Sequence, residues 1–185
     1  GDWLVDKDVL SKIFIKEQSA DIIVGKCNVL RKGKHVYTVS PSSTITFKDF
    51  YKNTLPHQAA FIRKSLFDKY GKYLEQYKIN SDYEFWLRTI VLHNCSVKII
   101  NQVISNYNLE GISSDIVNNP EVHKEVEEII GKYIPKRIVK DYELFQKYRS
   151  DQLFIDWFRG KSILYRIMRK LYKIEKKIKK VTPKK

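Results

Sequence analysis

PHQAAFIRKSLFDKYGKYLEQYKINSDYEFWLR, residues 56–88, contains one strand and the starts of two helices in a continuous run. Residues 58–62 form the short apolar run that is typical of a strand. Residues 64–70 predict a short helix, and Gly71 ends it because glycine readily adopts the backbone conformation at a helix C-terminus. The apolar run after Ser81 predicts a second helix. This order of elements indicates an α/β fold.

The start of the second helix contains a carboxylate, Asp82, that could have a catalytic role. Ser81 and Glu84 have the spacing of a capping box, in which each side chain binds the other residue's backbone N–H. Such a cap would fix the first turn of a helix that runs to about Asn94. Asp82 then lies in that turn, where the helix dipole favours the ionised carboxylate, and it is a candidate general base. The alternatives are that Asp82 only compensates the dipole and that Glu84 is only a capping partner.

Other polar side chains in the same stretch have either a binding role or an ordinary surface role. His57 could line a site or could be a hydrogen-bonded loop histidine. Arg63 and Lys64 could bind a phosphate group. The alternative is that they are ordinary surface residues, because basic residues at a helix start are common on any basic protein. The chain has no C-x-x-C motif and its histidines have no metal-like spacing, so Cys27 and Cys95 are predicted to be small buried hydrophobes.

Further strand and helix patterns lie on both sides of this stretch. A β-rich run at 21–30 leads through Gly33 into a second run at 35–39, and together they predict a hairpin. Apolar and polar side chains alternate over residues 96–106, and this pattern predicts one or two strands. Two short helices are also predicted, one capped by Asp6 or Asp8 and running to Ile15, the other at 46–53 with Thr46 as its cap and Asp49 at its third position.

After Ser114 the sequence becomes helical. Asn119 is a typical helix N-cap and Pro120 is a typical first helical residue, so together they predict a helix that runs to Tyr133. A second helix is predicted over 137–148. An apolar cluster at 153–158, closed by Gly160, is predicted to dock these helices on the domain. We therefore expect three parts: a domain at 1–114, a helical extension at 115–159 and a tail at 160–185.

The tail carries most of the positive charge of the chain. Residues 160–185 contain 11 Lys or Arg and one Glu, a net charge of +10 out of +14 for the whole chain. Its apolar residues have helical spacing and form one stripe: Ile163, Ile167, Leu171, Ile174, Ile178 and Val181. A basic helix of this kind suits an anionic membrane surface, where each basic residue contributes about 1 kcal/mol. A partner helix or a homodimer is the alternative, and nucleic acid is not expected because the rest of the chain is only mildly basic.

No apolar stretch approaches the 18 or so residues of a membrane-spanning helix, and residues 1–10 lack the pattern of a signal peptide. We therefore expect a cytoplasmic protein that is peripheral to the inner face of the cell membrane.

Two motifs follow each other in the opening stretch, first H-Q-x-x-F-x-R with S-L-F-x-x-x-G and then D-Y-E-F-x-L-R. Their positions are His57, Gln58, Phe61, Arg63, Ser65, Leu66, Phe67 and Gly71, then Asp82, Tyr83, Glu84, Phe85, Leu87 and Arg88. Residues 107–113, YNLEGIS, and residues 1–4, GDWL, add two weaker matches. Over about residues 1–114 the chain resembles the acceptor-side half of glycosyltransferase family 2, whose GT-A-type enzymes use nucleotide-sugar donors.

The resemblance implies an inverting glycosyltransferase that builds a cell-surface polysaccharide or a lipid-linked glycan. It assigns the catalytic base to Asp82 and a divalent metal, Mn or Mg, to Asp2. Six polar residues in or beside the motifs would contact the glycan or lipid-linked acceptor and the nucleotide-sugar donor: His57, Gln58, Arg63, Lys64, Glu84 and Arg88.

The family places a nucleotide-binding half before the region that GDWL resembles. The resemblance therefore predicts that these residues are the C-terminal piece of such an enzyme and are inactive alone. The alternative is a non-catalytic module, left from such an enzyme, that binds a membrane surface or a partner.

Overall fold

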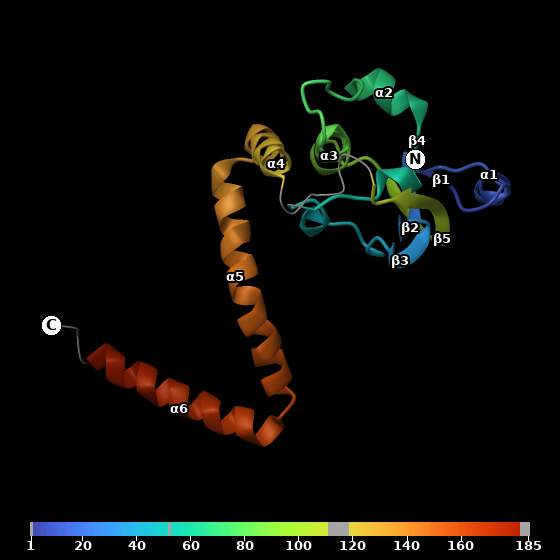
Figure 1. Ribbon diagram of the computed structural model, residues 1–185. Helices are drawn as coiled ribbons and strands as arrows, with labels where there is room; N and C mark the ends of the chain where they lie inside the picture. Colours follow the sequence, from blue (N-terminus) through green and yellow to red (C-terminus); the bar gives the residue numbers. More distant parts are fainter. Residues whose placement is uncertain (1, 52, 111–118, 182–185) are drawn as a thin grey trace. The chain divides into compact units, whose positions relative to one another are not determined.

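The computed structural model describes residues 2–51, 53–110 and 119–181, and of residues 150, 153, 162 and 177–181 it describes the backbone (Figure 1). The chain divides into two compact units, residues 1–133 and 134–185. The predicted boundary at Ser114 lies outside the described residues, as does the Gly111–Ser113 part of the YNLEGIS match. The helix that follows it belongs to the first unit.

The first unit is built on a mixed open sheet, which confirms the α/β class. Its central strand is β2 (Ile22–Arg31), which pairs in parallel with β5 (Val97–Asn108) and antiparallel with β3 (Lys34–Val39). The first half of β2 also pairs with the short strand β4 (Ala60–Ile62), and β1 (Trp3–Leu4) pairs with β5. The parallel pair joins two segments that are far apart in the sequence, and this pair organises the whole sheet.

The predicted hairpin is confirmed by the pairing of β2 with β3. Lys32 and Gly33 both have positive φ, 49° and 72°, which is the backbone of the two-residue turn that matches the twist of the strands. The turn sets Arg31 opposite Lys34.

Gly25 lies where β5 closely approaches the backbone of β2. A Cβ at this position would lie 2.5 Å from Ile104 Cδ1 and 2.7 Å from the carbonyl oxygen of Gln102. The pairing of β2 with β5 also shifts register between Val24 and Lys26. The glycine therefore allows β5 to bulge towards β2 without a collision.

Six helical elements accompany the sheet in the described part of the first unit. They are α1 (Val9–Ile13), η1 (Phe47–Asp49), η2 (His57–Ala59), α2 (Lys64–Tyr70), α3 (Ser81–Trp86) with its π-helical continuation η3 (Leu87–Leu92), and α4 (Pro120–Tyr133). The predicted end of α2 at Gly71, with φ of 86°, is confirmed. The cap of α4 is confirmed as well, because the side chain of Asn119 accepts the N–H of Glu121 at 3.0 Å.

Two local predictions around the opening stretch are wrong. Only Ala60–Ile62 is a strand, because the preceding residues form the short helix η2. The capping box is absent: Asn80 is the N-cap of α3, Ser81 lies inside the helix, and the N–H of Glu84 donates to the backbone oxygen of Asn80. The side chain of Glu84 is therefore available for another role.

A buried cluster joins α1 and η2 to the sheet. Its members are Val9, Ile13, Ile23, Cys27, Ala59 and Ile104. The predicted burial of Cys27 is confirmed, and Cys95 is half-buried; both are free thiols. The cluster fixes η2 on the sheet through Ala59, and η2 begins with His57.

The second unit consists of two helices. Residues 136–159, predicted as two segments, form the single helix α5 (Lys136–Arg159), and α6 (Ser162–Val181) follows. Large apolar side chains of α5 are exposed, among them Phe145, Tyr148, Phe154 and Trp157. Their docking on the domain stays a prediction. Within the described part of the chain, no helix has the length and apolar character required to cross a bilayer.

Candidate functional site

His57 and Asp82 form a hydrogen-bonded pair at the start of two helices. The Nδ1 atom of His57 lies 2.9 Å from Oδ2 of Asp82. His57 is the first residue of η2, and Asp82 is in the first turn of α3. The side chain of Asp82 is 19% exposed and that of His57 is 49% exposed, so both can be reached from solvent. Both residues were predicted from the sequence as candidate site residues, and the fold brings their side chains together.

The pair lines a cavity of about 310 Å³ in the first unit. Three apolar side chains of the sheet, Cys27, Val29 and Val39, form part of its wall. The polar groups around it are uncharged apart from the pair, and no Lys or Arg is among its described lining residues. These polar residues are Tyr37, Asn53, Thr54, Gln58, Asn80 and Tyr107. A cavity of this kind suits a neutral ligand that presents hydroxyl groups.

Asp82 changes the protonation of its partner. The hydrogen bond to Asp82 raises the pKa of His57 above its usual value, against the effect of burial, and the charges of Asp82 and Asp2 act in the same direction. With Nδ1–H donating to Oδ2, the other carboxylate oxygen of Asp82 remains for a ligand.

We expect Asp82→Asn to lower the pKa of His57, because the amide removes the negative charge that stabilises the imidazolium. The folded-state pKa lies above the unfolded value of about 6.5, so the pair stabilises the fold below that pH. This stabilisation is lost as the pH rises through the folded-state pKa. An NMR titration of the His57 ring measures the shift, and an unchanged pKa in the variant would show that the two groups do not interact in solution.

Glu125 holds the segment that precedes Asp82, and sequence reasoning missed it. Its carboxylate accepts the backbone N–H groups of Lys78, Ile79 and Asn80 at 2.8, 3.2 and 2.9 Å. Burial raises the pKa of Glu125, but these bonds and one from the Asn80 side chain outweigh burial and leave the pKa below its usual value. Only contacts across the fold show this role, since Glu125 resembles any acidic residue of an amphipathic helix.

Glu84 and Arg88 lie in a buried network instead of the cavity. Arg88 donates from Nε and Nη2 to the two carboxylate oxygens of Glu84, both at 2.8 Å, and the Tyr133 hydroxyl also donates to Glu84. Arg88 further donates to the carbonyl oxygens of Tyr70, Gly71 and Lys72. Glu84 is fully buried, and its bonds join α2, α3 and α4; its contact with a donor or acceptor stays a prediction. The ligand contact of Arg88, whose side chain is 12% exposed, also stays a prediction.

The remaining predicted site residues divide between the cavity and the surface. Gln58 lines the cavity. Arg63 is exposed but donates to the carbonyl oxygens of Gln18 and Ala20, and Lys64 is exposed beside it; neither lines the cavity. Asp2 is exposed at the end of β5, where its carboxylate accepts the N–H of Asn108 at 3.0 Å. Its charge is close enough to act on His57.

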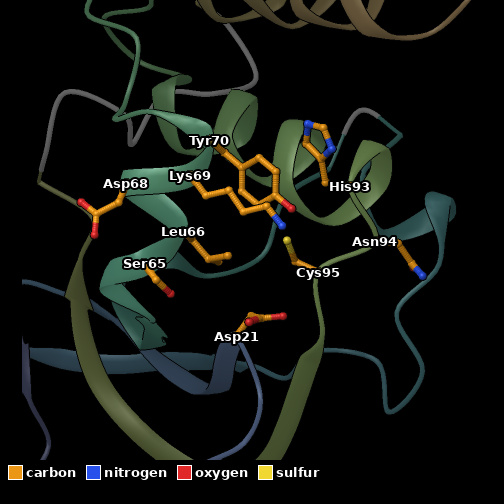
Figure 2. Close-up of a pocket in the computed structure, with 9 residues that line it drawn as sticks. All are labelled: Asp21, Ser65, Leu66, Asp68, Lys69, Tyr70, His93, Asn94 and Cys95. Carbon is orange, nitrogen blue, oxygen red and sulfur yellow. The ribbon is translucent and has the colours of Figure 1, made fainter.

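A second and larger cavity, of about 610 Å³, contains none of the predicted site residues (Figure 2). Figure 2 shows Lys69 and Tyr70 of α2 above Cys95, with His93 beside the tyrosine ring. Tyr70 and His93 stack at 4.3 Å, and Asp21 accepts the backbone N–H and the hydroxyl of Ser96. Burial raises the pKa of the Cys95 thiol, so it is not an activated nucleophile.

Within residues 2–51, 53–110 and 119–181, no three His, Cys, Asp or Glu side chains lie together as a metal-ligand set. Asp2 offers an exposed carboxylate whose charge acts on His57 of the pair. Magnesium is often held by one or two carboxylates together with substrate phosphates, so a single carboxylate fits a metal that arrives with its substrate.

No family model matches the chain, and no curated protein matches it.

Proposed function

We propose that residues 1–133 form the acceptor side of an inverting, nucleotide-sugar-dependent glycosyltransferase, similar to the GT-A-type enzymes of family 2. The observation that carries the proposal is the His57–Asp82 pair, which lines a neutral cavity at the position where the two sequence motifs meet. Asp82 has the geometry of a base that is held in place and partly exposed.

Asp82 removes the proton of an acceptor hydroxyl in this mechanism. As the O–H bond breaks, the hydroxyl oxygen forms a bond to the anomeric carbon of the donor sugar. The bond from that carbon to the diphosphate breaks at the same time, and the nucleoside diphosphate leaves with the electron pair. His57 holds Oδ2 of Asp82 through its Nδ1–H, which leaves Oδ1 to face the acceptor.

A divalent ion, Mn or Mg, would supply charge to neutralise the leaving diphosphate when it is bound. Asp2 is the residue of this chain that would hold it. The cavity itself has no described Lys or Arg, which supports its assignment to the acceptor instead of the diphosphate. Glu125 acts as a positioning residue because it fixes residues 78–80 just before Asp82.

A saccharide titration tests the acceptor site in the chain as it stands. We expect neutral mono- and oligosaccharides, added to the ¹⁵N-labelled protein, to shift the amide signals of residues 54–58 and 79–82, with Kd of about 1 mM. Asn53→Trp places a large side chain in the lining of the cavity and should abolish these shifts. Ser65→Trp is the matched control, because it places the same side chain at the second cavity.

Shifts that are confined to the second cavity, or that persist in Asn53→Trp, would contradict the acceptor assignment. No shift with any saccharide would favour the non-catalytic alternative.

A further inference from the structure

Helix α6 exposes a continuous apolar face. Ile163, Ile167, Leu171 and Ile174 are each at least 50% exposed, and Leu164 and Met168 widen the same face. At 3.6 residues per turn these six side chains fall within an arc of about 140°. An arc this wide is broader than the narrow seam of a coiled coil and is typical of a helix that lies on an extended apolar surface.

The opposite face of α6 is basic. Between residues 161 and 176 the sequence has six Lys or Arg and a single acidic residue, Glu175. The basic residues are Lys161, Arg166, Arg169, Lys170, Lys173 and Lys176. This charge of one sign opposes the approach of a second copy of the helix and is complementary to an anionic surface.

An aromatic cluster lies at the junction of α5 and α6. Trp157 and Phe154 at the end of α5 are each 62% exposed, and their rings stack at 6.0 Å. Phe158 contacts Tyr165 of α6 edge to face at 6.2 Å, and Lys161 lies 5.6 Å above the Trp157 ring. Trp and Tyr side chains are favoured at the boundary between lipid and water, where the ring is apolar and its polar atom stays hydrated.

We propose that residues 154–176 bind the surface of an anionic lipid bilayer. The apolar face of α6 enters the boundary between headgroups and acyl chains, the basic side chains contact lipid phosphates, and Trp157 and Phe154 anchor the junction. This inference does not depend on the proposed glycosyl transfer, because it uses no residue of the cavity.

Vesicle binding by the full chain tests the proposal. We expect binding to vesicles of phosphatidylcholine mixed with phosphatidylglycerol, little binding to phosphatidylcholine alone, and strong weakening by salt. The emission of Trp157 should shift to shorter wavelength on binding, and the shift should disappear in Trp157→Phe while binding remains.

A matched pair of variants separates the apolar face from simple charge attraction. Ile167→Ser with Leu171→Ser should weaken binding by about tenfold or more without changing the net charge. Ile138→Ser with Leu144→Ser removes the same two residue types from exposed positions of α5 and should leave binding unchanged. Circular dichroism confirms that the helices are retained in both variants.

Several results would overturn the proposal. Equal binding to neutral and anionic vesicles would exclude anionic lipid as the partner. Unchanged binding of the α6 variant would show that charge alone is responsible. A dimer that ignores vesicles and becomes monomeric in the α6 variant would identify the apolar face as a contact between copies.

Discussion

Asp82→Asn is expected to reduce glycosyl transfer by about 10²–10⁴-fold in a protein that joins these residues to a nucleotide-binding half. General base catalysis typically contributes a factor of this size. The amide of asparagine has nearly the shape of the carboxylate and can still accept a hydrogen bond from His57, so the fold should persist. The reduction should therefore appear in kcat, with little change in KM.

Asp68→Asn is the control for this experiment, since it makes the same change at an exposed residue of the second cavity. Turnover of this control should match that of the parent protein. Turnover of Asp82→Asn within about threefold of the parent, measured with the purified folded variant, would exclude Asp82 as the base.

Glu84→Gln is expected to lower the free energy of unfolding by about 3–5 kcal/mol. Glu84 is fully buried and its partner Arg88 is only 12% exposed, so neutralising the carboxylate leaves a buried guanidinium without its counter-charge. Urea unfolding, followed by the fluorescence of the buried Trp86, measures the change in the first unit.

The exposed pair of Asp6 and Lys12 in the first unit provides the comparison. The two side chains are 46% and 54% exposed, and Asp6→Asn should shift the urea midpoint of the first unit much less than Glu84→Gln does. A cost of below about 1 kcal/mol for Glu84→Gln would mean that the three carbonyl oxygens bound by Arg88 are sufficient to stabilise it.

Features determined by neighbouring residues could be predicted from the sequence. The hairpin turn at Gly33, the end of α2 at Gly71 and the Asn119 cap of α4 each depend on one or two local backbone preferences. A prediction from local spacing was wrong at Ser81 and Glu84, where the capping box is absent. The backbone N–H groups of a first helical turn can find partners without a capping box. Here the carboxylate of Glu84 accepts hydrogen bonds from Arg88 and Tyr133 instead.

The candidate site depends on contacts that local patterns do not reveal. His57 and Asp82 were both recognised as candidates, but their 2.9 Å contact requires η2 and α3 to be brought together by the fold. Glu125 contacts residues that precede it by 45 to 47 positions, and no spacing rule in the sequence identifies this contact.

The parallel pairing of β2 with β5 has a consequence for the synthesis of the protein. Asp21, just before β2, binds Ser96, just before β5, across 75 positions of sequence. Ribosomes add about 5–20 residues per second, so the nascent β2 waits roughly 4–15 seconds for its parallel neighbour. During this interval the edge of β2 that later pairs with β5 is unpaired, and apolar side chains of the β2–β3 hairpin are exposed to solvent. We therefore expect the nascent chain to be most prone to aggregation, and most dependent on chaperones, in the interval before β5 is made.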